Sequence, residues 1–412
     1  MERVREGKKH VLDCSEFYKL ERTPRKSVAV PYVLHELFDD IARLLLGGFS
    51  MPVVWCSISA HGFGHAAQVI PVLNTLGEVV PDLKVILRTC VEPSIFQENL
   101  RVNWELQAVP QDIGCIQEGP LAIDIAGTWA AHQAFHDNWT QRVEEEVRDM
   151  EDAGVDLVLS NISYLAIASA CQANRLGVAI ASLSWDQVLA PFMEATRADH
   201  RAIYEHIRQQ YMKTTHLIRL YPAIAMPIFP SSTETGPSFS LAAVPSQNLR
   251  KLVGIQTGEK LVLIAFGGVP LTSLPLKEME RCEGFHFLVG GMVLDGSWKR
   301  VHCLENILMP FGEMLKQADV VMTKPGYGTV VTAVHHGIPL VYVRRNNFVD
   351  EQSLVDYAHQ HGRALELTHE AFRRGVWKET LEAVLALPDP LKPSPQPDCR
   401  GIVRVLRRYL KA

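Results

Sequence analysis

Residues 318–345 read ADVVMTKPGYGTVVTAVHHGIPLVYVRR, a pattern of buried strand, turn, helix and second buried strand. The first strand ends at Thr323, Pro325 fixes the backbone after it, and Gly326 and Gly328 open the helix. The first N–H groups of such a helix have no partner within it, and the helix dipole favours an anion there. The alternative is a tight strand-to-helix turn without a ligand. We predict a diphosphate site at this turn, formed by Gly326, Tyr327, Gly328 and Thr329.

Strand-like apolar runs alternate with helical stretches on both sides of this segment. Such alternation is typical of parallel sheets with helices on both faces, and it predicts an α/β fold class with two doubly wound, Rossmann-like domains in tandem. The predicted strands are 53–58, 84–88, 156–160, 178–183 and 216–220 in the first domain, and 261–266, 285–289, 320–322 and 340–343 in the second.

Proline-rich stretches divide the chain. Five prolines lie between residues 222 and 245, a composition that continues neither a helix nor a strand. We therefore predict a linker over 222–250, between a first domain at 51–221 and a second at 251–387. Residues 1–50 form a predicted N-terminal appendage, and 388–412 a Pro-rich segment with a C-terminal helix. The apolar face of that helix suits packing on the neighbouring domain better than a membrane surface.

The composition excludes several classes of protein. With 412 residues, 47% hydrophobic and 21% charged, the chain is long enough for two cores and is not of the disordered type. Its 41 Lys and Arg against 46 Asp and Glu give a net charge of −5, so we expect no nucleic-acid partner. No apolar run reaches the ~20 residues of a membrane span, and we expect a cytoplasmic protein. The eight cysteines include no CxxC pair, so we expect no bound metal.

A second glycine turn follows the strand predicted at 53–58. It reads SAHGFGH, in which Gly62 and Gly64 permit a tight turn and close approach by a ligand, and His65 begins the next helix. Imidazole accepts a proton near neutral pH, so we interpret His65 as a general base. The alternative is a histidine that only caps or packs. We interpret His61, in the same turn, as structural.

Two further loops follow strands of the second domain. AFGGVP, residues 265–270, contains Gly267 and Gly268, whose amides could approach a phosphate. It lacks the GxGxxG spacing and the GxxxxGK[ST] lysine, which argues against a dinucleotide site and a P-loop. NNFVDEQS, residues 346–353, offers Asp350 and Gln352 as acceptors for sugar hydroxyls, although a solvated acidic loop is the alternative.

These motifs carry a resemblance to known families. The two tandem domains, the glycine turn ending in histidine and the series PGYGTV…HGIPLV…DEQ resemble GT-B nucleotide-sugar glycosyltransferases of the MurG-like class. The motifs HGFGH, DIGCIQ (112–117), SLSWD (182–186), KPGYGTV and VYVRRNNF are similar in kind and order to the glycosyltransferase-like N-terminal region of plant L-arabinokinases, over roughly residues 53–385. This sequence contains no match to the kinase half of those proteins or to its glycine-rich ATP loop, so we do not expect a sugar kinase.

The resemblance implies a cleft between the two domains, with residue roles that follow position by position. His65 would lie beside the acceptor or the donor phosphate, and the helix opened at Gly326 would hold the diphosphate. Asp350 and Gln352 would touch the donor sugar. The other residues implied are Met309, within the segment 308–311 that would face the base, and Asn161, Trp185 and Asp186 on the acceptor side.

The implied activity is transfer of a sugar from a nucleotide donor, a UDP-sugar first of all, to an acceptor hydroxyl that the sequence does not identify. His65 would take the acceptor proton, and backbone amides would stabilise the departing diphosphate, with inversion and with no metal or other cofactor. We place Asp112 with His65 in the catalytic set. Asp124 and Asp186 are the alternatives for orienting the imidazole.

One position departs from the family pattern. Glycosyltransferases of this class carry a glutamate in the diphosphate helix that pairs with both ribose hydroxyls, and Thr332 occupies that position here. A threonine has one hydroxyl and a shorter reach, so bidentate recognition of a ribose is lost. Two alternatives to a transferase therefore remain: a non-catalytic protein that binds sugar nucleotides, and a nucleotide-sugar epimerase on the same fold.

Overall fold

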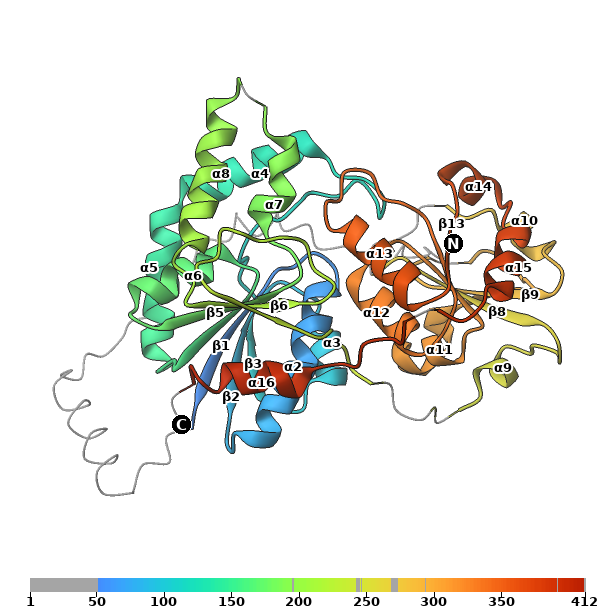
Figure 1. Ribbon diagram of the computed structural model, residues 1–412, viewed down its shortest axis with the longest axis horizontal. Helices are drawn as coiled ribbons and strands as arrows, with labels where there is room; N and C mark the ends of the chain where they lie inside the picture. Colours follow the sequence, from blue (N-terminus) through green and yellow to red (C-terminus); the bar gives the residue numbers. More distant parts are fainter. Residues whose placement is uncertain are drawn as a thin grey trace, which may run out of the picture. The chain divides into compact units, whose positions relative to one another are not determined.

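The computed structural model describes residues 51–410 except 195, 242–244, 246, 268–272, 293 and 391. Residues 1–50, predicted to be an appendage, and Gly268 lie outside the described residues. The described chain contains two parallel sheets covered by helices (Figure 1), which agrees with the predicted α/β class.

The first sheet has the strand order β3-β2-β1-β4-β5-β6-β7, with every neighbouring pair parallel. The order reverses between β1 and β4, because the chain runs outward from β1 to β3 and then returns to place β4 beside β1. The strands are β1 (Val53–Ile58), β2 (Lys84–Arg88), β3 (Asn103–Gln107), β4 (Leu157–Asn161), β5 (Leu176–Ala181), β6 (His216–Leu220) and β7 (Ser232–Thr235). Its helices are α2 (Gly64–Val79), α3 (Ser94–Asn99), α4 (Ile125–Asp137), α5 (Trp139–Asp152), α6 (Tyr164–Gln172), α7 (Trp185–Leu189) and α8 (Ala198–Tyr211).

The second sheet has the order β10-β9-β8-β11-β12-β13, again parallel throughout, and reverses between β8 and β11. Its strands are β8 (Lys260–Ala265), β9 (Phe285–Val289), β10 (Val301–Cys303), β11 (Val320–Thr323), β12 (Leu340–Tyr342) and β13 (Ala364–Glu366). The helices are α9 (Leu249–Leu252), α10 (Leu276–Glu280), α11 (Phe311–Gln317), α12 (Tyr327–His335), α13 (Glu351–His361), α14 (His369–Arg374) and α15 (Lys378–Ala386).

The predicted strands correspond to the interior strands of both sheets. The strands that were not predicted are the edges, β3 and β7 in the first sheet and β10 and β13 in the second. An edge strand is half solvated and carries no continuous apolar run, as the sequence STET of β7 illustrates. Because β7 falls within the predicted linker at 222–250, the first sheet extends further along the chain than the prediction allowed.

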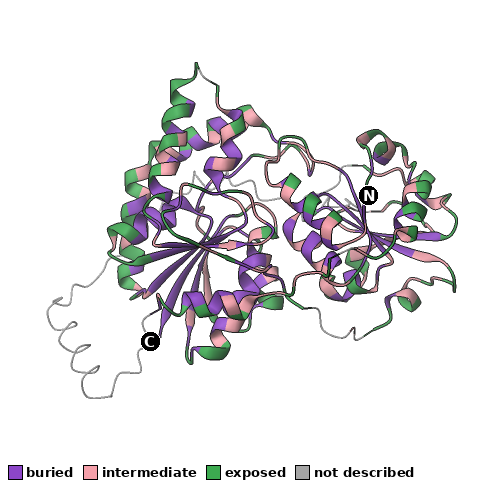
Figure 2. Ribbon diagram, viewed as in Figure 1, coloured by how far each residue is buried: buried purple, intermediate pink, exposed green. Residues whose placement is uncertain are grey.

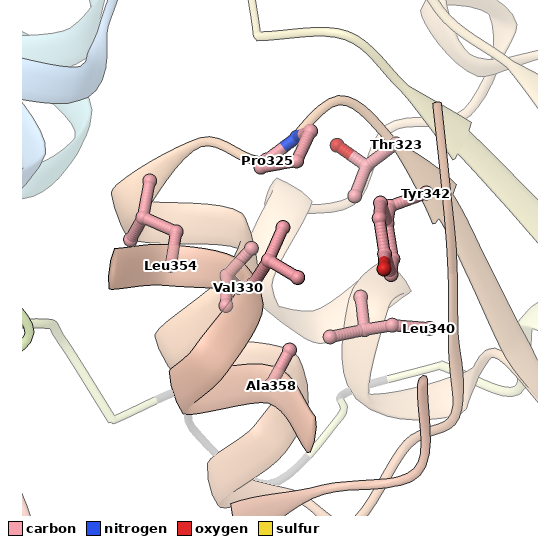
Figure 3. Close-up of a pocket in the computed structure, with 8 residues that line it drawn as sticks. Thr323, Pro325, Val330, Leu340, Tyr342, Leu354 and Ala358 are labelled. Carbon is pink, nitrogen blue, oxygen red and sulfur yellow. The ribbon is translucent and has the colours of Figure 1, made fainter. Parts of the chain in front are cut away.

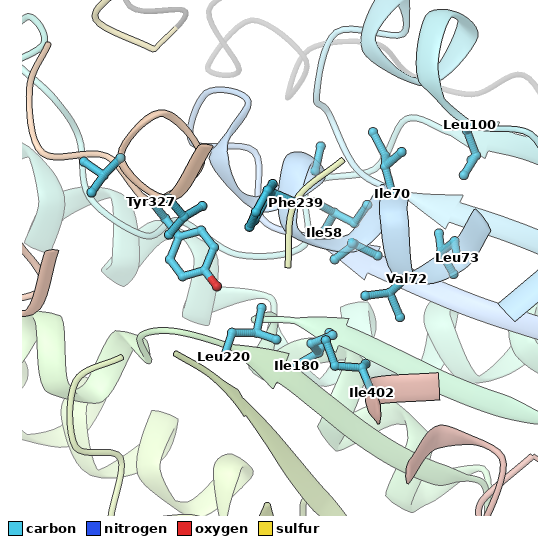
Figure 4. Close-up of a cluster of buried hydrophobic side chains, with 14 of the residues drawn as sticks. Ile58, Ile70, Val72, Leu73, Leu100, Ile180, Leu220, Phe239, Tyr327 and Ile402 are labelled. Atoms are coloured by element: carbon cyan, nitrogen blue, oxygen red, sulfur yellow. The ribbon is translucent and has the colours of Figure 1, made fainter. Parts of the chain in front are cut away.

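The C-terminal helix α16 (Cys399–Leu406) packs against α2 of the first sheet, so that its apolar face is covered, as favoured from the sequence (Figure 1). Buried residues follow the strands and the inner faces of the helices (Figure 2). One large apolar cluster contains residues of both domains (Figure 4). Ile58 and Leu220 lie on β1 and β6 of the first sheet, Tyr327 lies on α12, and Ile402 lies on α16. Within the described residues, no helix is both long enough and apolar enough to cross a bilayer.

Candidate active site

Both sheets place their glycine turns where the strand order reverses. In open parallel sheets, ligands bind at the carboxyl ends of the strands at this point. In the first sheet the turn after β1 lies beside the end of β4, and in the second the turn after β8 lies beside the end of β11. The motifs chosen from the sequence therefore occupy the two positions that the topology favours for a ligand.

The two turns approach each other. Gly62 (φ +71°) and Gly267 (φ +73°) both adopt left-handed backbone conformations, and a Cβ built on Gly62 would lie 3.0 Å from the carbonyl oxygen of Gly267. A Cβ on Gly328 of α12 would lie 3.7 Å from the Cβ of Ala67 on α2. Gly64 is the first residue of α2 and has open space around it. The close approach predicted at Gly62 is therefore to the other glycine turn.

A chain of side-chain amides holds His65. Its Nδ1 lies 2.6 Å from Oδ1 of Asn161, at the end of β4. Asn161 Nδ2 donates to Gln68 Oε1 at 3.0 Å, and Gln68 Nε2 donates to Ser182 Oγ at 2.9 Å. These bonds turn the Asn161 carbonyl toward His65, so Nδ1 carries the proton and Nε2 keeps its lone pair. Asn161, predicted to line the acceptor side, is buried and orients His65 instead.

The charge state of His65 suits a base. Burial lowers the pKa of His65 and outweighs the opposing effect of the hydrogen bond to Asn161, and nearby His61 lowers it further. At neutral pH the ring is therefore uncharged. With Nδ1 occupied, Nε2 is the atom that can accept a proton.

Asp112, predicted to act with His65, faces His61. His61 Nε2 lies 3.6 Å from Asp112 Oδ1, and in the described part of the chain neither atom has a hydrogen-bond partner. The other oxygen, Oδ2, accepts hydrogen bonds from Ser59 Oγ and, at 2.9 Å, from Trp185 Nε1. Burial would raise the pKa of Asp112, but its contacts with His61, Ser59 and Trp185 hold that pKa below its usual value. His61, interpreted as structural from the sequence, becomes a second candidate base.

The other acceptor-side residues are largely enclosed. Trp185 is 4% exposed and contacts both histidines, with ring centroids 5.0 Å from His61 and 5.7 Å from His65. So buried a ring offers little surface for stacking on a sugar. Asp186 is fully buried and accepts from Ser184 Oγ at 2.6 Å. Asp124 caps α4 by accepting from the Gly127 amide at 2.8 Å, so neither carboxylate orients His65.

The N-terminus of α12 has free donors. Gly326 is the N-cap, in an extended conformation without a side-chain cap. Among the described residues, the N–H groups of 326–329 meet no acceptor. Four unpaired amides and the positive end of the helix dipole make this a site for an anion. Thr329 lies in the first turn, half-buried, where its hydroxyl can add to the amides.

Tyr327 contributes its backbone to this turn but sends its side chain into the core (Figure 4). Its hydroxyl donates to the carbonyl of Tyr221 at 2.9 Å and accepts from the buried amide of Ser238 at 3.1 Å. Only the backbone N–H of Tyr327 therefore remains a candidate for nucleotide binding.

Replacing Tyr327 by phenylalanine should lower stability without weakening nucleotide binding. The change leaves the Ser238 amide and the Tyr221 carbonyl unpaired, which costs about 1–3 kcal/mol. Urea unfolding measures this cost, with Tyr204→Phe as a control because its hydroxyl makes no hydrogen bond within the described residues. Unchanged stability combined with weakened nucleotide affinity would instead place the hydroxyl at the ligand.

In the segment 308–311, proposed to face the base of the nucleotide, the predicted residue Met309 is not the one that is exposed. Met309 is 8% exposed and packs in the core, where its sulfur accepts from Gln317 Nε2 at 3.4 Å. The preceding residue, Leu308, is 92% exposed. Leu308 and Phe311, which is 41% exposed, are therefore the apolar side chains of this segment that are open to a ligand.

The loop after β12 is organised by its own ion pairs. Asp350 Oδ1 lies 3.1 Å from Arg345 Nη2, and Gln352 Oε1 accepts from Arg344 Nη1 at 3.1 Å. Both residues predicted to touch the donor sugar are thus held in place by arginines. Asp350 also raises the pKa of His65 and of Lys324, so its charge acts on the turn after β1 and on the segment between β11 and α12.

Lys324 was not predicted as a site residue. It lies between the end of β11 and the cap of α12, and only 8% of its surface is exposed. Its Cε lies 3.5 Å from the position a Cβ would take on Gly267. The signal was present in the motif KPGYGTV, but a lysine before a turn is ordinarily solvated, and only the fold shows that this one is buried.

Beneath α12 the packing leaves little space. A cavity of about 10 Å³ is bordered by Thr323, Pro325, Val330 and apolar side chains of β12 and α13 (Figure 3). That volume holds at most one water molecule, so this cavity is too small for a nucleotide. In the described part of the chain, no three His, Cys, Asp or Glu side chains are grouped to hold a metal ion.

Comparison with known proteins gives a partial match in sequence. No protein-family model matches the chain. Over 334 residues it is 26% identical to an L-arabinokinase from Arabidopsis thaliana, a match that covers 80% of this chain and 32% of the plant protein. A stretch of 52 residues is 44% identical to UDP-glycosyltransferase 2 from Phaeomoniella chlamydospora, covering 12% of this chain and 11% of that protein. The chain thus spans a third or less of the length of these relatives.

Solved structures match over nearly the whole chain. The glycotransferase of kitacinnamycin is 16% identical with a TM-score of 0.57, covering 88% of this chain and 95% of that one. A UDP-glucosyltransferase from Polygonum tinctorium capable of glucosylating indoxyl is 12% identical with a TM-score of 0.57, covering 89% and 100%. A UDP-glucose:anthocyanidin 3-O-glucosyltransferase in complex with UDP is 13% identical with a TM-score of 0.56, covering 88% and 95%.

The fold is GT-B. Two parallel sheets of this topology and the likeness to these glycosyltransferase structures agree with the fold class predicted from the sequence. The MurG-like class within that fold stays a prediction.

Proposed function

We propose that this protein transfers a sugar from a nucleotide donor, most simply a UDP-sugar, to an acceptor hydroxyl. The observation that carries the proposal is the pairing of an uncapped α12 N-terminus with an uncharged, oriented histidine on the opposing turn. A nucleotide sugar needs an anion site for its diphosphate, and an acceptor hydroxyl needs a base. The relatives named as UDP-glycosyltransferases and UDP-glucosyltransferases support the choice of donor.

On the acceptor side, His65 Nε2 would take the hydroxyl proton as the oxygen attacks the anomeric carbon. Asn161 holds the ring in the required tautomer through Nδ1. An asparagine carbonyl is neutral, so the imidazolium formed would be stabilised mainly by the nearby carboxylates of Asp112 and Asp350, both of which raise the pKa of His65.

On the donor side, the bond from the anomeric carbon to the β-phosphate oxygen breaks, and negative charge gathers on the departing diphosphate. The amides of 326–329 and the α12 dipole are fixed before the reaction and favour that charge. A single displacement of this kind inverts the anomeric centre. We propose no metal, because these groups supply the charge stabilisation from the protein itself.

The test is product analysis. UDP-sugars supplied with an acceptor library should yield a glycoside and UDP, and NMR of the product should show the opposite anomeric configuration to the donor. An isomerised sugar nucleotide would show an epimerase. A thermal-shift screen of nucleotides should precede it, since a ligand at 100 times its Kd stabilises by about 2.7 kcal/mol.

The second candidate is a sugar-nucleotide-binding protein without turnover, which Thr332 favours. Thr332 lies on α12, half-buried, in place of the glutamate that would grip both ribose hydroxyls. Nucleotide binding without any product would support this candidate over the transferase.

Weak discrimination between ribose and 2′-deoxyribose should accompany Thr332. A glutamate that pairs with both hydroxyls leaves a buried acceptor unpaired when the 2′-OH is missing, a penalty of about 1–3 kcal/mol. We therefore expect Thr332→Glu to tighten UDP and to leave 2′-deoxy-UDP unchanged or weaker, as measured by calorimetry. Strong 2′-OH discrimination by the unmodified protein would show that another residue reads the ribose.

A further inference from the structure

Lys324 is a buried cation without a partner. Among the described residues, its ammonium group has no hydrogen bond and no ion pair, although only 8% of the residue is exposed. Burial lowers the pKa of Lys324 to about 8, and Arg345 lowers it while Asp350 raises it. The side chain is largely buried, while Nζ keeps some contact with solvent. A cation that has lost much of its hydration and has no partner is stabilised by an anion, so this position favours a negatively charged ligand.

The neighbouring cations are already compensated. Arg345 pairs with Asp350 at 3.1 Å and with Glu351 at 3.4 Å. Arg344 pairs with Glu366 at 3.0 Å and with Glu351 at 3.4 Å. Of these three described cations, Lys324 is therefore the one that remains available to a ligand.

The position of Lys324 matches that of the free amides. It precedes the α12 cap by two residues, and its side chain runs beside Gly267 in the turn after β8. A diphosphate seated on the amides of 326–329 would therefore lie beside the segment that carries Lys324. Lysine binds phosphate as a point charge and needs no fixed geometry.

We infer that Lys324 is the cationic ligand of the donor diphosphate and neutralises the charge that develops on it as the sugar departs. This inference rests on the proposed function for the identity of the ligand. The negative charge of the diphosphate would then be compensated by the Lys324 side chain as well as by the backbone amides.

The inference predicts linkage between nucleotide binding and protonation. A bound diphosphate favours the ammonium form and raises the pKa of Lys324. Below about pH 8 the lysine is already charged, whereas above it binding must take up a proton. The affinity should then fall by up to about tenfold per pH unit above 8. The charged groups that face Lys324 are Arg345 and Asp350.

The experiment is calorimetric titration of UDP, and of inorganic pyrophosphate, at pH 7, 8 and 9. Lys324→Met should weaken both ligands by about 10- to 100-fold at pH 7 and abolish the pH dependence. Lys324→Arg should retain binding but take up no proton. Lys316→Met is the matched control, because that lysine is exposed on α11 near the opposite end of β11. It should bind as the unmodified protein does.

The outcomes separate this inference from the proposed function. The unmodified protein alone is enough to test whether nucleotide binding is linked to protonation. Binding heats measured at pH 8 in buffers of different ionisation enthalpy give the number of protons taken up. Tight UDP binding without uptake, and equal in Lys324→Met, overturns the inference and leaves the proposed function standing. Lysine-dependent binding of pyrophosphate with no gain from uridine supports the inference and removes the nucleotide donor. If neither UDP nor pyrophosphate binds, both the role of Lys324 and the proposed function are wrong.

Discussion

Replacing Gly328 by valine should abolish UDP binding in a protein that stays folded. The proposed donors at the α12 N-terminus are backbone amides, so blocking their approach matters more than removing a side chain. A Cβ at this position meets the Cβ of Ala67 at 3.7 Å, an ordinary contact. We expect the larger, branched side chain of valine to crowd the approach of a ligand to these amides. We expect no UDP binding at millimolar concentration by calorimetry, with a melting temperature close to that of the unmodified protein.

Two variants control for this effect. Gly328→Ala adds only the tolerated Cβ and should retain measurable binding. Thr329→Val removes one hydroxyl at nearly constant volume and should cost about 0.5–1.5 kcal/mol of binding energy, the usual worth of one hydrogen bond. Equal and small losses from Gly328→Val and Thr329→Val would remove the main basis for a nucleotide site on α12.

The interior of the fold was predictable because each central strand is a short apolar run between turns. The series from β8 to β12 shows this, since burial on both faces leaves a continuous hydrophobic pattern. The edges were not predictable for the converse reason. β7, with the sequence STET, is solvated on one side and lies among prolines, so its membership of the first sheet depends on pairing with β6.

For the candidate site, the sequence located the turns but not the contacts between side chains. Asp112 pairs with His61 because Gly114 in the DIGCIQ loop has no side chain, and a Cβ there would overlap the imidazole. His65 forms a hydrogen bond with Asn161 because β1 and β4 are neighbours at the point where the strand order reverses. Both pairings join residues far apart in the chain, which local patterns do not specify.

Replacing His65 by alanine should lower turnover by about 10² to 10⁴ while leaving UDP affinity nearly unchanged. A general base acts mainly in the transition state, so its loss appears in kcat and little in nucleotide binding. Because the pKa of His65 is lowered by burial, the neutral and active form should persist to pH values below 6.5. The acid limb of the kcat/KM profile should therefore lie below the range of an ordinary histidine.

The second histidine supplies the decisive comparison. His61→Ala removes the ring that faces Asp112 and leaves the Asn161 bond to His65 intact. If His65 is the base, His61→Ala and Asp112→Asn should act through the electrostatics of the site and reduce turnover far less than His65→Ala. The opposite ranking, with Asp112→Asn matching His61→Ala, would transfer the role of base to the His61 and Asp112 pair. Loss of UDP binding in His65→Ala, with no separate effect on chemistry, would instead make His65 a phosphate ligand.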